Sequence, residues 1–291
     1  MRHGESIPVW QRAPVLSGRS ARRLLEAAPG LHSVSLDLGR TEETVTAADD
    51  DLFLPGGQRV AKADLANAFS DPEDCIELRE GTCAKVYVYD EDARRYYKLY
   101  QPFEGRAPTV VINNATMHAI VGKDPWQDEA EKVAALRLRR GECLDTCCGL
   151  GYSAQLLAES GFRHVTTCEV DANVLRMAAL NPWSEGLFEN RRIEIVPEDV
   201  CEFARSCAAG RFACIFHDPP TVFMAGELYS GGLYREFARI MTRRGELYHY
   251  VGSPGARAGR DYARGVMRRL HEAGFTAVRR ATGGVLALRG E

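Results

Sequence analysis

A glycine-containing turn within residues 142–154 constrains the fold of this chain more than any other segment. A short apolar strand ends at Asp145, the turn carries Gly149 and Gly151, and a helix follows. Glycine lets the backbone pass close to a ligand because no Cβ stands in the way. The helix that follows directs unpaired N–H groups at that ligand. The turn therefore predicts a site for a nucleotide-like ligand.

Strands and helices alternate along the chain after this turn. We expect helices at 152–160, 172–180, 232–241 and 261–273, strands at 165–171, 192–196, 212–216 and 246–251, and a terminal hairpin at 277–281 and 285–288. Repeated alternation predicts an α/β fold with a parallel sheet and helices on both of its faces. The terminal hairpin makes the sheet mixed.

Four acidic residues stand at the expected carboxyl ends of these strands: Asp145, Glu169, Asp199 and Asp218. Ligands of open α/β sheets bind at such ends. Glu169 comes 20 residues after Gly149, which is about the separation at which an acidic residue binds ribose hydroxyls. The four residues are therefore candidates for one binding site.

Residues 130–291 resemble the class I S-adenosylmethionine-dependent methyltransferases. The segment from Asp145 to Gly151 looks like their first motif, and His217-Asp218-Pro219-Pro220 looks like their fourth motif, at the reaction centre. The resemblance implies a Rossmann-like fold with a mostly parallel seven-stranded sheet and a C-terminal hairpin. It also implies S-adenosylmethionine as cofactor, with Glu169 at the ribose and Asp199 near the adenine amino group. The implied cofactor-binding residues are Asp145, Cys147, Gly149, Gly151, Tyr152, Glu169, Val170, Asp199, Val200 and Asp218.

The sequence before this region is of a different kind. A small antiparallel β domain is predicted by short alternating runs at 32–38, 43–46, 75–78, 84–89, 95–100 and 109–112. One helix, at 62–69, interrupts them. We expect three parts: a lead-in over 1–30 with one helix near 20–28, an antiparallel β-rich lid over 31–122, and the cofactor-binding domain over 123–291.

A β-rich lid before a methyltransferase-like domain is similar to the arrangement in spermidine synthases and other aminopropyltransferases. Uncharacterised archaeal methyltransferase-like proteins resemble the layout better. Residues 110–118 look like the strand and polar loop that lead into the cofactor domain, which implies that Asn114 and His118 contact substrate. Asp218-Pro219-Pro220-Thr221 replaces the acidic, Ser/Thr-rich element of the aminopropyltransferases. This replacement argues against polyamine transfer.

Several reactions can use the same sulfonium cofactor, because a nucleophile can attack its methyl group or its methionine side. The protein mainly supplies positioning, and no metal is needed. We expect methyl transfer to a small-molecule amine, with Asp218 and His217 as proton acceptors. Tyr229 and Tyr250 are candidates to hold a cation over an aromatic ring, Tyr229 at the reaction centre and both toward the substrate.

Other functions stay open. One is displacement that releases methylthioadenosine, either by cyclisation, as in azetidine-2-carboxylate synthases of methyltransferase fold, or by aminopropyl-type transfer. RNA base methylation and a cofactor-binding subunit without turnover rank below these.

Composition limits which binding partners and which cellular location we expect for this protein. The chain of 291 residues has no run of about 18 apolar residues, so no membrane span is expected. Nine cysteines without a C-x-x-C pair predict reduced thiols, no structural zinc and a cytoplasmic protein. The net charge is −3, with 15 acidic and 5 basic side chains over 37–92 but 12 arginines and 5 acidic residues over 231–291. Without a continuous basic surface we do not expect nucleic acid as partner. The expected partner is a small-molecule substrate, and a homodimer stays open.

Overall fold

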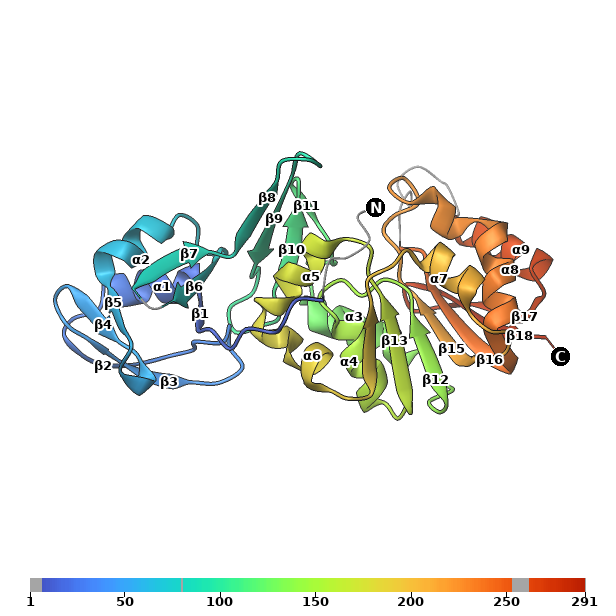
Figure 1. Ribbon diagram of the computed structural model, residues 1–291, viewed down its shortest axis with the longest axis horizontal. Helices are drawn as coiled ribbons and strands as arrows, with labels where there is room; N and C mark the ends of the chain where they lie inside the picture. The colour runs from blue at the N-terminus through green and yellow to red at the C-terminus, as the bar shows by residue number, and fades with distance from the viewer. Residues whose placement is uncertain (1–6, 80, 253–261, 291) are drawn as a thin grey trace. The chain divides into compact units, whose positions relative to one another are not determined.

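Two compact units make up the chain in the computed structural model, which describes residues 7–79, 81–252 and 262–290 (Figure 1). The first unit consists of Met1–Asp128 and Asn173–Phe188. The second consists of Glu129–Ala172 and Glu189–Glu291. Each unit has its own sheets and its own buried core.

The first unit contains three small antiparallel sheets, with the strand orders β2-β3-β4-β5, β1-β6-β7 and β11-β10-β9-β8. The strands are β1 (Val15–Ser17), β2 (Gly30–Val34), β3 (Glu43–Ala47), β4 (Asp51–Phe53), β5 (Arg59–Ala61), β6 (Cys75–Arg79), β7 (Thr82–Lys85), β8 (Tyr87–Asp90), β9 (Arg95–Tyr100), β10 (Thr109–Ile112) and β11 (Ala115–Thr116). Helices α1 (Gly18–Leu25) and α2 (Lys62–Ala68) and the 3-10 turn η1 (Pro55–Gly57) connect them. The expected antiparallel β domain is therefore present, as three sheets.

Residues 15–25 are part of this β-rich unit, although the sequence predicted a lead-in over 1–30. Strand β1 pairs antiparallel with β6, and Leu16 lies opposite Ile76. Leu16, Ala21 and Leu24 are buried in the core of the unit. Ala21 and Leu24 are three positions apart and lie on one side of α1, whereas Leu16 belongs to strand β1. Burial of these side chains explains why the segment packs.

A segment distant in sequence completes the first unit. It comprises most of α5 (Ala172–Ala179), the turn η2 (Pro182–Ser184) and α6 (Glu185–Glu189). The Asn173 side-chain amide donates to Asp90 Oδ2 at 2.7 Å, and the Trp183 indole N–H donates to the Leu38 carbonyl at 3.2 Å. The chain thus leaves the second unit after one strand and returns before the next.

The second unit has one seven-stranded sheet with the order β14-β13-β12-β15-β16-β18-β17. The strands are β12 (Glu142–Asp145), β13 (His164–Cys168), β14 (Ile193–Val196), β15 (Phe212–His217), β16 (Met241–Tyr250), β17 (Phe275–Ala281) and β18 (Gly284–Arg289). Neighbours from β14 to β16 pair in parallel, and β18 pairs antiparallel with β16 and β17. The structure confirms the predicted mixed sheet with a terminal hairpin.

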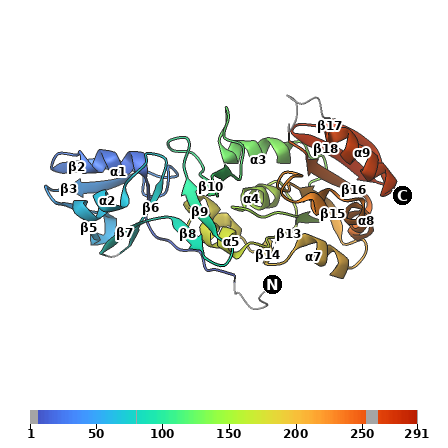
Figure 2. The same ribbon diagram turned by 90° about the horizontal axis from the view of Figure 1, so that it is seen from above.

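Helices cover both faces of this sheet. They are the later part of α3 (Pro125–Ala134), α4 (Tyr152–Glu159), α7 (Val200–Ser206), α8 (Gly231–Ile240) and α9 (Tyr262–Glu272), with the turn η3 (Gly226–Tyr229). The strand order reverses at β12, so right-handed crossovers place α4 and α7 on opposite faces. Figure 2 shows α4 on one side of the strands and α7 and α8 on the other. In open α/β sheets, ligands bind at the carboxyl ends of the strands beside such a reversal, which are here the ends of β12 and β15.

Candidate active site

The glycine turn between β12 and α4 has the backbone conformation that its residues suggest. Gly149 and Gly151 have φ of +55° and +76°, a left-handed region that glycine enters without steric cost. Gly151 is the N-cap of α4. The Cys148 N–H donates to the Cys168 carbonyl at 2.8 Å, which holds the turn against the end of β13.

Glu169 follows β13 and reaches back to this turn. Its Oε2 accepts a hydrogen bond from the Gly149 N–H at 2.9 Å, and its Oε1 accepts one from the Asp171 N–H at 3.0 Å. The 20-residue separation is bridged because β12 and β13 are parallel neighbours, with Asp145 opposite Thr167. Burial raises the pKa of Glu169 to about 7. A hydroxyl or cationic ligand would stabilise its ionised form.

Asp145 ends β12 in a fully buried position. Its Oδ2 accepts hydrogen bonds from Ser153 Oγ at 2.9 Å and Thr167 Oγ1 at 2.8 Å. Its Oδ1 is buried and has no hydrogen-bond partner among the described residues. Burial raises the pKa of this carboxyl to about 7. An orphaned carboxylate oxygen is unusual in a folded protein and fits a donor supplied by a ligand.

Asp218 follows β15 and forms an ion pair that the sequence analysis did not predict. Lys132 of α3 places its Nζ 2.7 Å from Asp218 Oδ2 and 2.7 Å from Glu129 Oε1. The same ammonium lies 4.3 Å from the centroid of the Tyr250 ring. The Lys132 and Glu129 side chains are only 6% and 5% exposed, so the cation and both carboxylates interact with little water between them.

Glu129 adds a second orphaned oxygen to this cluster. Its Oε2 is buried and has no partner among the described residues. Burial, and then the charge of Asp218, raise the pKa of Glu129 well above its usual range. The only sequence signal for the pair was an acid and a lysine three positions apart, in a segment where we predicted no helix.

His217 contacts a hydrogen-bond partner through each ring nitrogen, and its role as a proton acceptor stays a prediction. Its Nδ1 lies 2.7 Å from Thr146 Oγ1, and its Nε2 lies 2.8 Å from the Leu228 carbonyl. The carbonyl can only accept, so Nε2 carries the proton and Nδ1 accepts from the threonine hydroxyl. Burial lowers the pKa of His217 to about 4. Both ring nitrogens are therefore engaged in a neutral imidazole.

Tyr229 fixes the turn after Asp218. Its hydroxyl donates to the Pro220 carbonyl at 3.0 Å, and its own carbonyl accepts from Arg269 Nε at 2.9 Å. The side chain is nearly buried. Tyr229 thus holds the Asp-Pro-Pro segment in place, and Tyr250 contributes its ring to the environment of Lys132.

The other predicted cofactor residues lie along the same strand ends. Val170 is 59% exposed directly after Glu169, so its side chain is available to pack on a ring. Asp199 caps α7 by accepting from the Cys201 N–H at 2.7 Å. Val200 and Tyr152 are buried, Val200 within the core cluster. Burial raises the pKa of the Cys147 thiol well above its usual range, so this thiol is neutral.

The two predicted substrate residues Asn114 and His118 belong to the first unit. Asn114 Oδ1 accepts from the Tyr96 hydroxyl, and His118 Nδ1 lies 2.9 Å from Thr109 Oγ1. Their contact with substrate stays a prediction.

Neither a metal-binding cluster nor a membrane-spanning helix is present in the described residues. Within 7–79, 81–252 and 262–290, no group of three or more His, Cys, Asp and Glu side chains is arranged to hold a metal ion. Within the same ranges, no helix is long and apolar enough to cross a membrane. All nine cysteines are free thiols.

The arrangement brings four carboxylates to the carboxyl edge of one sheet, those of Asp145, Glu169, Asp218 and Glu129. One ammonium, that of Lys132, lies among them. The two orphaned oxygens and the exposed valine fit a cofactor that carries hydroxyl groups, a positive charge and a planar ring. S-adenosylmethionine has all three.

Comparison with known proteins agrees with this geometry. No family model matches the sequence. The chain is 32% identical over 275 residues to the uncharacterized protein MJ1233 of Methanocaldococcus jannaschii, and the match covers 91% of each chain. A spermidine synthase in complex with a transition-state analogue is similar in structure, with a TM-score of 0.57 and 17% identity over 70% of this chain and 73% of that one.

The spermidine synthase of Thermotoga maritima gives a TM-score of 0.53 at 17% identity, over 70% of this chain and 71% of that one. Likeness at this level of identity establishes the fold. This chain therefore belongs to the family of the archaeal protein MJ1233, and it has a spermidine-synthase-like fold.

Proposed function

We propose that this protein is an S-adenosylmethionine-dependent transferase that methylates a small-molecule amine. The observation that carries the proposal is the contact of Glu169 with the Gly149 N–H, 2.9 Å across two strand ends. This contact supports the proposal because the Glu169 carboxylate lies beside the N-terminus of α4, where ribose hydroxyls would find an acceptor.

Each end of the cofactor finds a matching group. Glu169 would accept from the ribose hydroxyls, Val170 would pack on the adenine ring, and Asp199 would lie near its amino group. The orphaned Asp145 Oδ1 would accept from the methionine ammonium. Bound S-adenosylmethionine supplies an electrophilic carbon next to a cationic sulfur.

Asp218 is the residue that we assign to the acceptor. Its carboxylate would accept a hydrogen bond from the amine and direct the nitrogen lone pair to the reacting carbon. The nitrogen then loses a proton, which Asp218 can receive. The ion pair with Lys132 holds the carboxylate in place, and the two prolines with Tyr229 stiffen the turn that carries it. Most of the rate enhancement would come from this positioning.

The second candidate function is attack by a nucleophile on the methionine side chain of S-adenosylmethionine, at a carbon bonded to the sulfur. The match to spermidine synthases covers 70% of the chain, which is more than the second unit. The likeness therefore includes part of the β-rich unit as well as the cofactor fold. An enzyme of this second kind would release methylthioadenosine, by alkyl transfer to an amine or by cyclisation of the methionine arm.

A product analysis separates the two candidates. The purified protein is incubated with S-adenosylmethionine alone and with a panel of small amines, and products are identified by mass spectrometry. Methyl transfer gives S-adenosylhomocysteine only when an acceptor is present. Methylthioadenosine above the enzyme-free background would contradict methyl transfer and support the second candidate. Failure to bind the cofactor at all, measured by calorimetry, would contradict both.

A further inference from the structure

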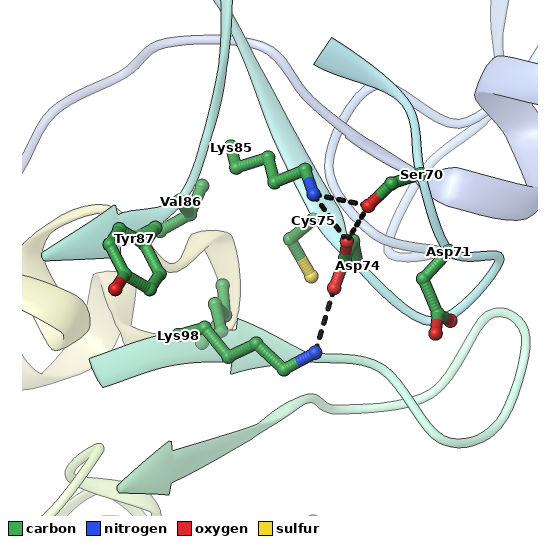
Figure 3. Close-up of a pocket in the computed structure, with 9 residues that line it drawn as sticks. Ser70, Asp71, Asp74, Cys75, Lys85, Val86, Tyr87 and Lys98 are labelled. Atoms are coloured by element: carbon green, nitrogen blue, oxygen red, sulfur yellow. Dashed lines mark hydrogen bonds and ion pairs between the residues drawn. The ribbon is translucent and has the colours of Figure 1, made fainter. Parts of the chain in front are cut away.

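The first unit contains a pocket of about 250 Å³ whose lining residues come from three parts of its sequence (Figure 3). Ser70 and Asp71 follow α2, Asp74 and Cys75 stand at the start of β6, Lys85, Val86 and Tyr87 join β7 to β8, and Lys98 and Leu99 belong to β9. The volume is slightly below the roughly 300–1,000 Å³ typical of sites for drug-sized ligands. It suits a small metabolite.

Two lysines converge on one buried carboxylate in this pocket. Lys85 Nζ lies 3.2 Å from Asp74 Oδ2, and Lys98 Nζ lies 3.0 Å from Asp74 Oδ1. Figure 3 shows both ammonium groups directed toward Asp74 from opposite sides. The Asp74 side chain is 6% exposed, whereas those of Lys85 and Lys98 are 39% and 29% exposed. The carboxylate is thus covered while both cations remain accessible.

Two lysines and two aspartates line the pocket, and the charge of Asp71 acts on both lysines without ion-pair contact. Asp74 neutralises one of the two ammonium charges. Asp71 is the other acid of the pocket, but it forms no ion pair with either lysine among the described contacts, and its Oδ1 accepts from the Glu73 N–H at 2.9 Å. Burial lowers the pKa of Lys98, but its hydrogen bond to Asp74 and the charges around it more than offset this and raise the pKa overall. Lys98 is therefore a cation at neutral pH.

The rest of the lining is apolar or aromatic. Cys75, Val86 and Leu99 are almost fully buried. Burial raises the pKa of the Cys75 thiol far above its usual range, so Cys75 acts as an apolar wall. Tyr87 is 48% exposed, and its ring stacks on that of Tyr96 with centroids 5.9 Å apart. A ligand with a planar apolar part would find a surface next to the lysine pair.

We propose that this pocket binds a small organic anion, with its carboxylate or phosphate group at Lys85 and Lys98 and its apolar part against Val86, Leu99 and Tyr87. An ammonium has three donors, and Lys98 gives one to Asp74. The anion would take up donors that Asp74 leaves, and Asp74 would keep the two cations close together. The site lies within the first unit and does not depend on the reaction assigned to the second.

The test is a calorimetric titration of the full-length protein, without S-adenosylmethionine, using phenyl phosphate, benzoate and inorganic phosphate. We expect saturable binding of phenyl phosphate or benzoate with a Kd below about 1 mM. Preference for phenyl phosphate assigns a phosphate group to the natural ligand, and preference for benzoate assigns a carboxylate. Inorganic phosphate that binds as well as phenyl phosphate would overturn the apolar part of the site.

Matched variants locate the binding. Lys98→Met should weaken it at least about tenfold, and Lys98→Arg should retain it within about threefold, because the charge is kept. Arg22→Met removes one exposed charge from the same unit outside the pocket and should leave the affinity unchanged. Circular dichroism checks folding, and Lys85→Met replaces Lys98→Met if the latter does not fold. No saturable binding of any probe, or unchanged affinity in the lysine-to-methionine variant, overturns the proposal.

Discussion

Asp74 in the first unit and the pair Asp145 and Glu169 in the second unit have opposite surroundings. In the first unit, Asp74 lies between Lys85 and Lys98 and both of its oxygens are paired. In the second unit, Asp145 is buried and Glu169 is half-buried, and neither has a lysine or arginine in ion-pair contact in the described part of the chain. Desolvation raises the pKa of each to about 7. A paired carboxylate holds cations in place, whereas an unpaired one at a strand end is poised for a ligand with a positive charge or hydroxyl groups.

The largest expected effect comes from Asp218. Asp218→Ala should lower turnover by about 10²–10⁴-fold, the usual contribution of a positioned proton acceptor, with little change in cofactor affinity. Product formation measured by mass spectrometry, together with calorimetric titration of the cofactor, checks both parts. Glu202→Ala is the matched control, because this exposed residue only pairs with Arg205 on the surface. Full activity of Asp218→Ala would mean that the reaction centre is elsewhere.

Lys132 should dominate the stability of the second unit. Lys132→Met leaves Asp218 and Glu129 without their cation and should lower the free energy of unfolding by about 3–5 kcal/mol, as expected for breaking a buried ion pair. Chemical denaturation measures the change. Arg205→Met breaks an exposed pair and should cost no more than about 1 kcal/mol. Equal effects of the two variants would contradict the burial argument.

Asp74 and Asp145 should respond differently when their charge is removed. Because the folded-state pKa of Asp145, about 7, lies above its ordinary value of 3.8, its contribution to stability is present at low pH. It is lost as the pH rises from about 4 to about 7. Asp145→Asn should therefore abolish a loss of stability between pH 5 and pH 8.

Asp74→Asn should destabilise by about 1–3 kcal/mol because the two ammonium groups lose the negative charge and one of the two acceptor oxygens of Asp74.

Denaturation curves of both variants at pH 5 and pH 8 test this contrast. If Asp145→Asn lowers the free energy of unfolding at pH 8 more than Asp74→Asn does, Asp145 has a cationic partner and the contrast is wrong.

Glu169 should contribute to cofactor affinity by a smaller amount. Glu169→Ala is expected to weaken binding by about 1–3 kcal/mol, the cost of leaving ligand hydroxyls without an acceptor. Glu169→Gln keeps one acceptor oxygen and should lose less. Calorimetric titration at one ionic strength provides the comparison. An alanine variant with unchanged affinity would remove Glu169 from the ribose site.

The smallest expected effect is a pH dependence of cofactor binding in the wild type. A cationic ligand favours the ionised forms of Asp145 and Glu169, so its affinity should rise as the pH passes from 6 to 8 through the folded pKa values of about 7. The gain is at most about tenfold per pH unit for each linked proton. Proton release, measured in buffers of different ionisation enthalpy, identifies the linkage. Tighter binding at pH 6 would contradict it.

Much of the second unit could be predicted from sequence because its signals are local. The helices after Gly151 and after Ser230 begin within a residue of the expected positions. By contrast, β16 begins at Met241, five residues before the predicted start at Glu246. The prediction missed these residues because apolar alternation is clear only in the second half of the strand. The first unit was predicted less well, since its short strands pair in three sheets and β1 meets β6 across 60 residues of sequence.

In the candidate site too, residues with a local sequence signal could be predicted, and residues that depend on distant contacts could not. Glu169 could be placed from its distance to the glycine turn, because the ends of neighbouring parallel strands must lie at one edge. His217 could not be judged, because only the fold reveals that Thr146 and the Leu228 carbonyl engage both ring nitrogens. Lys132 was missed because its partner Asp218 lies 86 residues away.

The sequence alone determined the alternation of strands and helices, the glycine turn and the row of acids at the strand ends, since these depend on residues close together in the chain. The tertiary structure decided which acids are paired, which oxygens stay without a donor, and where two lysines share one aspartate. Those outcomes depend on burial and on contacts between distant segments. Burial sets the energy of a charge, and distant contacts supply its partner.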